Sequence, residues 1–587
     1  MGGSTRARKG DTVQRRIARA LTRRRFLGST AGVLAAPWLG SAVLCAQAPP
    51  DPAWRQKIEA ALPAKAPVTP RKPRKLLIFD LNVGYGGHRS IGSANMAFEM
   101  MGKKTAAFET VISRDPAVFK PDSLRQFDAA FFNNTVGNQF EDPALRQSLI
   151  EFVYGGGGLM GVHGTSVGFT RWPGAKEDWP EFGLMLGGRG ASHRDANEHI
   201  FIKLDDSMHP LNRPFDGKGF EYRDEFFRYH GPYSRNRVRV LFSIDVKKSE
   251  ELQGQPLKAF RKDNDYALAW VRRYGRGRVF YCTIAHQPRV FWDPKMLQFY
   301  LGATQFALGD LPAPTIPSAK LTPAVHAREK LGWRLGIEAY TFHKYTLFEA
   351  IDKTAELGLA YMGGLCFQKV SKDIPKKFDL NLTDDELKQV RLKLDAAGIT
   401  MLTYYIGRIP KDEAGCRKVF EFGRKIGIET FMSEPVPEAL DTIERLCDEY
   451  DINVALHNHG PKASPHYWRP EAIVKVCEGR TRRIGACADV GYWMRAGIDP
   501  IQGIKTLKDR LITLQMHDLH AQGAEGHDVP WGTGVGQTEQ VLREIHGLGI
   551  RPTMFGLEYS YDWLDSMSEI AQSIDFFNKI SQDLAKG

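Results

Sequence analysis

The second half of the chain contains eight short runs rich in apolar and β-branched residues, each separated from the next by a segment with helical periodicity. These runs are Leu335–Tyr340, Ala360–Gly364, Ile399–Tyr405, Ile428–Glu434, Ile452–His457, Ile484–Asp489, Leu511–His517 and Met554–Glu558. Strands joined by helices pair in parallel, because each helix returns the chain to the start of the next strand. Eight such units in about 250 residues predict a (β/α)8 TIM barrel, with a doubly wound open sheet as the alternative.

Several segments between the runs begin with residues typical of helix N-termini. Thr346 and Glu349, and likewise Thr383 and Glu386, have the spacing of a capping box, in which each side chain bonds to the backbone of the other residue. Pro500 suits a first helical turn, where its missing N–H leaves no hydrogen bond unmade. These signals indicate helices between the strands.

The first half of the chain also alternates apolar runs with helical segments. Buried parallel strands are expected at Lys75–Asp80, Thr105–Val111, Asp128–Phe132 and Gly158–His163, with helices around Gly92–Gly102 and Pro143–Tyr154. Further on, Leu268–Tyr274 and Arg278–Thr283 flank a Gly-Arg-Gly turn, which predicts a hairpin. We therefore expect a layered α/β sheet in this half.

Two stretches rich in proline, alanine and lysine divide the chain. Residues 49–73 and 311–332 have the composition of extended linkers, and they place domain boundaries on either side. The predicted organisation is an α/β domain over 74–310 and a barrel over 333–584. Two domains of this size fit a chain of 587 residues.

The N-terminus has the features of an export signal. Thr22–Leu27 resembles the twin-arginine motif, and the apolar stretch Gly28–Leu44 leads to Ala46-Gln-Ala48. Residues 1–48 are therefore predicted to be a signal peptide that directs the chain by the twin-arginine route to the periplasm or another extracytoplasmic space. The alternative is a basic tail before a short membrane helix. The stretch contains Pro37 and is shorter than the ~20 residues of a membrane span, so no stable anchor is expected.

The charge of the chain is concentrated in that leader. The whole sequence carries a net charge of +12, but nine of its 80 basic residues and one of its 68 acidic residues lie in 1–48. The rest of the chain is close to neutral, which argues against a nucleic-acid partner. With 42% apolar and 25% charged residues, the composition excludes a disordered chain.

The cysteines do not suggest a disulfide framework. There are seven in 587 residues, and one of them, Cys45, lies in the predicted leader. The others form no CxxC pair and are expected to be small buried side chains with free thiols.

Four polar side chains end barrel runs at the same mouth. Glu434, Asp489, His517 and Glu558 end the fourth, sixth, seventh and eighth runs. A buried charge needs a partner, and one divalent cation would supply it for all four. Three oxygen ligands and one nitrogen ligand suit Mn²⁺, Mg²⁺ or Co²⁺. The alternative is that each residue independently starts an ordinary loop.

Such a site has a definite chemistry. A cation bound to a carbonyl and a neighbouring hydroxyl stabilises the enediolate that forms when a carbon-bound proton leaves. Two carboxylates can then remove and return that proton. The product is an epimer, an isomer or an elimination product, depending on where the proton returns and whether a substituent leaves. The ligands alone leave these outcomes open.

The barrel resembles a known family. The matching segments are Leu335–Phe342, Lys425–Glu434, Leu456–His459, Asp489–Gly497, Met516–Asp518 and Gly556–Glu558. On these segments, residues 333–584 resemble the sugar phosphate isomerase/epimerase family, or xylose-isomerase-like TIM barrel. The resemblance implies that Glu434, Asp489, His517 and Glu558 bind the metal and that Glu434 and Glu558 also move protons. It further implies a small-molecule carbohydrate substrate.

The resemblance also points to residues around the metal. The family often has a histidine facing the substrate after the fifth strand, so we assign a catalytic role to His457 and leave His459 as a substrate contact or a structural histidine. Arg495 and Trp493 are candidate sugar contacts, with a solvated arginine and a packed indole as the alternatives. Many relatives have a glutamate where this chain has Gly363 and Gly364, which leaves the precise sugar open.

The first domain resembles a second family. The matching segments are Gly86–Arg89, Gly155–Gly164, Met208–Pro210, Arg223–Glu225 and Tyr274–Tyr281, followed by His286. On these segments, residues 74–310 resemble the ThuA-like (trehalose-utilisation) family, whose fold is similar to that of class I glutamine amidotransferases. The nucleophilic cysteine of those enzymes is absent from Gly161–Gly164, so glutaminase activity is not expected.

The histidines of these motifs form a possible second polar site. The candidates are His88, His163, His193, His209, Glu225 and His286. The resemblance suggests that some of them line a carbohydrate pocket. Taken singly, each is better interpreted as an ordinary loop or core residue.

The sequence as a whole favours an exported sugar isomerase or epimerase. One alternative is a lyase or dehydratase acting on a 3-keto-glycoside or a keto-inositol. Another is a carbohydrate-binding protein built from enzyme-like folds. A nuclease is disfavoured by the near-neutral charge outside the leader. The oligomeric state is left open.

Overall fold

The computed structural model describes residues 51–171, 177–257 and 261–587. The predicted export signal, residues 1–48, lies outside them, so this prediction is not tested. Within the described ranges, no helix combines the length and hydropathy needed to cross a membrane.

The N-terminal domain is built on a nine-stranded mixed sheet with the order β2-β1-β3-β4-β11-β10-β9-β6-β7. Its strands are β1 (Lys75–Phe79), β2 (Glu109–Ser113), β3 (Ala129–Asn133), β4 (Gly158–Val162), β6 (Glu198–Leu204), β7 (Phe220–Asp224), β9 (Arg239–Ile244), β10 (Ala267–Tyr274) and β11 (Gly277–Cys282). Strands β1–β4 and β11 run parallel, and β10 and β11 form the predicted hairpin. A separate pair contains β5 (Arg189–Ser192) and β8 (Arg228–His230).

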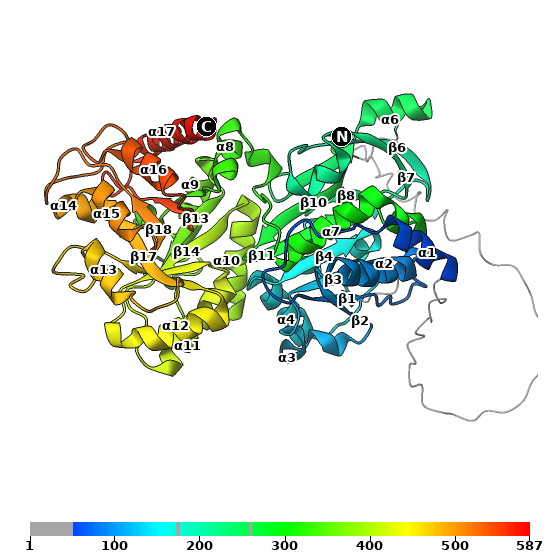
Figure 1. Cartoon of the computed structure of the whole chain (residues 1–587), viewed down its shortest axis with the longest axis horizontal. Helices are drawn as coiled ribbons and strands as arrows, with labels where there is room; N and C mark the ends of the chain where they lie inside the picture. The colour runs from blue at the N-terminus through cyan, green and yellow to red at the C-terminus, as the bar shows by residue number, and fades with distance from the viewer. Residues whose placement is uncertain (1–50, 172–176, 258–260) are drawn as a thin grey trace, which may run out of the picture. The chain divides into compact units, whose positions relative to one another are not determined.

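This sheet has a hydrophobic core on each face. Along β1, Leu76 and Ile78 point into one core and Leu77 and Phe79 into the other, as the alternation of a strand requires. The domain's helices are α1 (Pro52–Ala61), α2 (Ser90–Thr105), α3 (Pro121–Leu124), α4 (Pro143–Tyr154), α5 (Pro180–Leu186), α6 (Val246–Gln253) and α7 (Pro294–Leu308). Helices α2 and α7 contribute to the first core and α4 to the second, which confirms the layered α/β fold (Figure 1).

The C-terminal domain is a closed barrel of eight parallel strands, so the open-sheet alternative is excluded. The strands are β12 (Leu335–Ile337), β13 (Tyr361–Leu365), β14 (Thr400–Tyr405), β15 (Thr430–Ser433), β16 (Asn453–His457), β17 (Ile484–Asp489), β18 (Leu511–Met516) and β19 (Phe555–Leu557). Pairing of β12 with β19 closes the ring. All eight predicted runs contain a strand, and the TIM barrel is confirmed.

Helices surround the barrel strands (Figure 1). They are α9 (Leu347–Glu356), α10 (Asp384–Ala397), α11 (Glu413–Ile426), α12 (Leu440–Tyr450), α13 (Pro470–Val476), α14 (Val490–Arg495), α15 (Pro500–Leu507), α16 (Thr538–Gly547) and α17 (Met567–Leu584). Both predicted capping boxes are present, at the starts of α9 and α10, and Pro500 opens α15. Local sequence signals therefore decide where these helices begin.

The two stretches expected to be extended linkers each contain a helix. Residues 49–73 include α1, whose first turn is capped by the Asp51 side chain and whose Ile58 is fully buried. Residues 311–332 include α8 (Pro323–Leu331), which packs against α17. Proline starts both helices, so the feature that suggested an extended chain instead marks a first helical turn.

The described cysteines are all free thiols, and five of the six are buried. This agrees with the expectation that they serve as small apolar side chains.

Candidate active site

The residues singled out in the barrel lie at the carboxyl ends of five consecutive strands. Glu434 follows β15, His457 ends β16 and Asp489 ends β17. His517 follows β18, and Glu558 follows β19. Because the strands of a closed parallel barrel all point the same way, these side chains converge on one mouth.

Three of the four predicted metal ligands form a tight, buried group. One ligand atom from each of Asp489, His517 and Glu558 lies within 4.8 Å of the others. His517 Nε2 is 3.7 Å from Asp489 Oδ1 and 3.9 Å from Glu558 Oε1. Two oxygens and a nitrogen around one point can hold a divalent cation.

Two atoms of this group have no hydrogen-bond partner within the described chain. They are Asp489 Oδ2 and His517 Nε2, and both are buried. His517 Nδ1 lies 2.7 Å from Asp528 Oδ1, and a carboxylate only accepts, so we assign the ring proton to Nδ1. The Nε2 lone pair then faces the carboxylates, an arrangement that costs free energy unless a cation or a proton lies between them.

Glu434 belongs to a neighbouring group instead. It lies with His457 and His459, whose Nδ1 atoms are 3.5 Å and 2.5 Å from Glu434 Oε1. On its other side, His457 Nε2 is 3.6 Å from Asp489 Oδ2. The structure thus brings three predicted ligands together and places His457 between them and the fourth.

The carboxylates of the two groups differ in acidity. Burial alone would raise the pKa of Glu434, but hydrogen bonds and charge from His457 and His459 lower it to about 2. Burial raises the pKa of Glu558 to about 7, with Asp489 adding to the increase and His517 opposing it. One carboxylate is therefore held ionised, and the other can gain or lose a proton near neutral pH.

A further buried carboxylate, Glu338, follows β12 and was not predicted. Burial first, and then the charge of Glu558, raise its pKa to about 8, and Thr403 Oγ1 donates to it at 3.3 Å. A Cβ atom at Gly363 or Gly556 would collide with this carboxylate. The glycine at position 363 therefore leaves room for Glu338.

The structure gives the two other candidate sugar contacts supporting positions instead. Arg495 Nε donates to Gly526 O at 3.1 Å, and Nη2 lies 3.3 Å from Asp528 Oδ2, so this arginine ties down the loop after β18. Trp493 is fully buried in the barrel core, where it packs against Gly503. Its indole belongs to the core rather than to a sugar subsite.

Three supporting residues were missed by the sequence analysis. Asp528 orients His517, and Gln515 Nε2 donates to Glu558 Oε2 at 2.7 Å. Asn458 joins the ends of β16 and β17 through bonds to the backbone N–H and C=O of Asp489. Asp528 lies in a loop, Asn458 is next to His457 and Gln515 lies within β18, and no spacing in the sequence marks them.

A cavity gives access to the group that contains Glu434. It has a volume of about 330 Å³, and Glu434, His459 and Tyr405 are among the residues that line it. The ionised carboxylate is therefore reachable by a small molecule, whereas Asp489 and His517 lie deeper.

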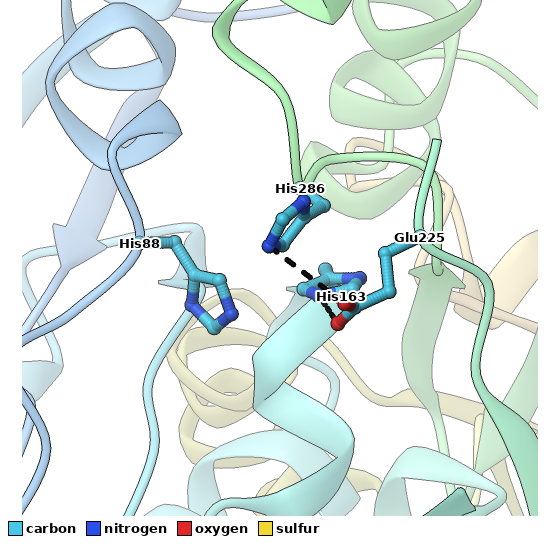
Figure 2. Close-up of side chains that lie close together, drawn as sticks. All are labelled: His88, His163, Glu225 and His286. Atoms are coloured by element: carbon cyan, nitrogen blue, oxygen red, sulfur yellow. Dashed lines mark ion pairs between the residues drawn. The ribbon is translucent and has the colours of Figure 1, made fainter. Parts of the chain in front are cut away.

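The N-terminal domain contains a second group of ligand-type side chains (Figure 2). One atom from each of His88, His163, Glu225 and His286 lies within 4.8 Å of the others. His193 Nδ1 is also 3.2 Å from Glu225 Oε2. The structure thus brings four of the six candidates together and places a fifth, His193, beside them.

His209, the sixth candidate, lies elsewhere in the domain. Its Nδ1 accepts from the backbone N–H of Leu211 at 3.3 Å, and its Nε2 is 3.1 Å from Pro314 O. It caps the 3-10 helix Pro210–Phe215, so its role is structural and the sequence expectation is corrected for this residue.

Comparisons with known proteins identify both halves of the chain. Residues 75–307 match the family model for trehalose utilisation (ThuA), and residues 351–580 match that for the xylose isomerase-like TIM barrel. The curated proteins include no match to this sequence.

Several solved structures resemble one part of the chain. An uncharacterised protein from Parabacteroides distasonis is 31% identical, with 42% of this chain and 99% of that chain covered and a TM-score of 0.36. A ThuA-like protein from Bacteroides uniformis is 19% identical, with 42% and 94% covered and a TM-score of 0.34. A sugar phosphate isomerase/epimerase from Parabacteroides distasonis is 12% identical, with 42% and 94% covered and a TM-score of 0.33.

Proposed function

Because the chain joins a trehalose-utilisation (ThuA) domain to a xylose isomerase-like TIM barrel, we propose that it is a divalent-metal-dependent sugar isomerase or epimerase acting on a keto or aldose sugar. The observation that carries the proposal is the pair of unpartnered atoms, Asp489 Oδ2 and His517 Nε2, buried beside Glu558. Buried acceptors without a hydrogen-bond partner suit a cation.

Asp489, His517 and Glu558 would hold the ion, and Glu434 is the fourth candidate ligand from the neighbouring group. An oxygen-rich donor set favours Mn²⁺, Mg²⁺ or Co²⁺. When bound, the ion would supply positive charge that stabilises an enediolate. Asp528 supports this role because it keeps the His517 lone pair on Nε2.

The protein's own carboxylates supply the proton transfers. Glu434 is ionised at neutral pH, lines the cavity and can remove a carbon-bound proton. Glu558 is the second carboxylate at the site and can accept and return a proton. If the two act on opposite faces of the substrate, the product is an epimer. If the proton returns to the neighbouring carbon, it is an isomer.

Elimination is the second candidate, and Glu338 is the observation that favours it. This buried carboxyl, whose pKa is raised to about 8, holds a proton at neutral pH beside Glu558. A lyase needs such an acid to protonate the leaving group. The same structure would then act on a 3-keto-glycoside or a keto-inositol.

We also propose that the reaction takes place outside the cytoplasm. The support is the twin-arginine-like segment Thr22–Leu27, which lies outside the described residues.

Deuterium exchange tests the proposed function. A panel of keto sugars and aldoses is incubated with the Mn²⁺-loaded protein in D₂O and followed by NMR. We expect deuterium at a carbon adjacent to the carbonyl and an epimeric or isomeric product. Asp489→Asn is expected to slow exchange by about 100-fold or more, whereas Glu539→Gln, on the exposed face of α16, is the matched control.

Two results would contradict the proposed metal-dependent isomerase or epimerase. Undiminished exchange by the chelator-treated protein would overturn metal dependence. Release of a leaving group together with deuterium uptake would identify a lyase instead.

A further inference from the structure

The N-terminal domain gathers three imidazoles and a carboxylate from four separate segments. His88 lies in the loop before α2, and His163 directly follows β4. Glu225 follows β7, and His286 lies in the loop after β11. Figure 2 shows the four side chains around one shared space.

We propose that His88, His163, Glu225 and His286 form a second metal site, which binds a first-row transition ion such as Zn²⁺ and is separate from the barrel site. Three nitrogen ligands and one oxygen ligand suit Zn²⁺, whereas the oxygen-rich barrel group suits harder ions. This inference does not depend on the proposed sugar chemistry.

The orientation of His163 is the first argument. Its Nδ1 lies 2.9 Å from Thr283 O, and a carbonyl can only accept, so we assign the ring proton to Nδ1. Its Nε2 then presents a lone pair to Glu225 Oε1 at 3.3 Å. Two acceptors this close repel one another unless a cation or a proton lies between them.

The unpartnered atoms are the second argument. His163 Nε2 and His88 Nδ1 are buried and have no hydrogen-bond partner within the described chain. A buried ring nitrogen without a partner costs free energy unless an ion or a proton occupies the space that it faces.

A single side chain ties together the three loops that carry the histidines. Asn134 accepts from the backbone N–H of Gly164 at 2.9 Å and donates to Ser90 Oγ at 3.1 Å and Ala285 O at 2.9 Å. Each of these residues lies within two positions of a histidine of the cluster. The ligands are thus held in place before any ion binds, as an efficient metal site requires.

The backbone provides a further sign of a specialised site. His163 has a φ of 40° and Asn134 a φ of 56°, both in the left-handed region that non-glycine residues rarely adopt. Asp224, which precedes Glu225, also holds the loop that carries His286. It accepts hydrogen bonds from the backbone N–H groups of His286 at 3.1 Å and Gln287 at 3.0 Å. Strain of this kind persists only where the surroundings enforce it.

The cluster can also be reached from solvent. Glu225 Oε2 lies near His193, whose side chain is 40% exposed and lines a cavity of about 610 Å³. An ion held by the four residues would therefore lie close to an accessible surface, as in metal sites that keep a position open for a small molecule.

Metal retention by the full-length protein tests the proposal. The barrel site is first removed with the double variant Asp489→Asn/His517→Gln, and the protein is equilibrated with Zn²⁺ and freed of excess ion. We expect one Zn²⁺ per chain by elemental analysis and at least a tenfold loss of affinity on adding His286→Gln. His199→Gln, which removes a histidine paired with Glu221 outside the cluster, is the matched control.

A second measurement covers the case in which the double variant fails to fold. In the otherwise unchanged protein, Glu225→Gln should lower the number of retained Zn²⁺ ions by one, and Co²⁺ bound in place of Zn²⁺ should lose its visible absorption. No Zn²⁺ retention in the folded double variant, or equal retention in the His286 and His199 variants, would overturn the second site. Either result would mean that a proton, rather than a metal, lies between His163 and Glu225. Sugar turnover is not measured, so failure of the proposed function cannot produce these results.

Discussion

At the scale of single residues, the barrel mouth shows how neighbours decide what a carboxylate can do. Glu434 is kept ionised by His457 and His459, whereas Glu558 and Glu338 have raised pKa values because they are buried near other carboxylates. Three glutamates in one site can thus act as a base, as a group that exchanges its proton and as a neutral acid.

The raised pKa of Glu338 predicts a pH dependence of stability. The folded chain holds this proton between its ordinary pKa of 4.5 and about 8, whereas the unfolded chain releases it. The unfolded state then binds fewer protons, so stability falls as pH rises through this window, by at most about 1.4 kcal/mol per pH unit. In Glu338→Gln this contribution is absent.

Urea unfolding at pH 5 and pH 8, with chelator present, measures the difference. We expect Glu338→Gln to lose less stability than the wild type between the two pH values. The exposed Glu539→Gln variant should follow the wild type. An identical change in all three proteins would show that Glu338 is ionised in the folded state.

The Asp528–His517 contact predicts a positioning role. Asp528→Asn keeps the shape of the side chain but weakens its hold on the Nδ1 proton of His517, so the lone pair on Nε2 is no longer fixed. We expect Mn²⁺ affinity to fall about 10- to 100-fold while the fold is retained. Competition with a fluorescent chelator measures the Mn²⁺ affinity.

Asp575→Asn, on the exposed face of α17, is the control for this substitution. Unchanged affinity in Asp528→Asn would remove Asp528 from the metal site. A loss of helical circular dichroism would instead assign it a role in folding.

At the scale of elements, the ends of the strands determine which site residues can be predicted from the sequence. Apolar runs predict every barrel strand because strands buried on both faces need continuous apolar residues. Asp489 and Glu558 stand out because each ends such a run. Glu338 was missed because the predicted strand extended to Tyr340, whereas β12 ends at Ile337.

The residues that hold the ligands in place are less predictable than the ligands. Asp528 lies in the loop after β18, and Asn134 follows β3, so neither shows a periodic pattern. Asp528 reaches His517 only through the fold of the loop between them, and Asn134 bonds to residues that are distant in the chain. Strands β6 and β7, at one end of the sheet, were missed for a related reason, since their partly exposed residues form no continuous apolar run.

The three bonds of Asn134 predict that it organises the second site. Asn134→Ala removes bonds to the loops that carry His88, His163 and His286. Because the remaining buried groups lose a partner, we expect about 1–3 kcal/mol less stability. Zn²⁺ affinity should fall by about tenfold or more.

Unfolding in urea and Zn²⁺ titration measure the two effects of this substitution. Asn197→Ala, in an exposed loop of the same domain, is the control. A loss of stability with unchanged Zn²⁺ affinity would mean that the loops are fixed without Asn134 and that its role is packing alone.

At the scale of the whole molecule, the leader should determine where the protein works. Arg23→Lys/Arg24→Lys is expected to leave the chain in the cytoplasm with residues 1–48 attached, because the twin-arginine route recognises the arginine pair. Arg15→Lys/Arg16→Lys alters a second pair outside the motif and is the control. Cell fractionation locates the protein, and its intact mass shows whether residues 1–48 are still attached. Equal export of both variants would contradict the twin-arginine assignment.

Two metal sites of different chemistry also predict two separate contributions to stability. An ion present at 100 times its dissociation constant stabilises the folded state by about 2.7 kcal/mol. Mn²⁺ should protect peptides of the barrel from hydrogen exchange, and Zn²⁺ should protect those of the N-terminal domain. Asp489→Asn should abolish the first effect and leave the second, because Asp489 lies only in the barrel group. Loss of both effects in this variant would mean that one ion stabilises the whole chain, since separate sites cannot respond together to a change in one ligand.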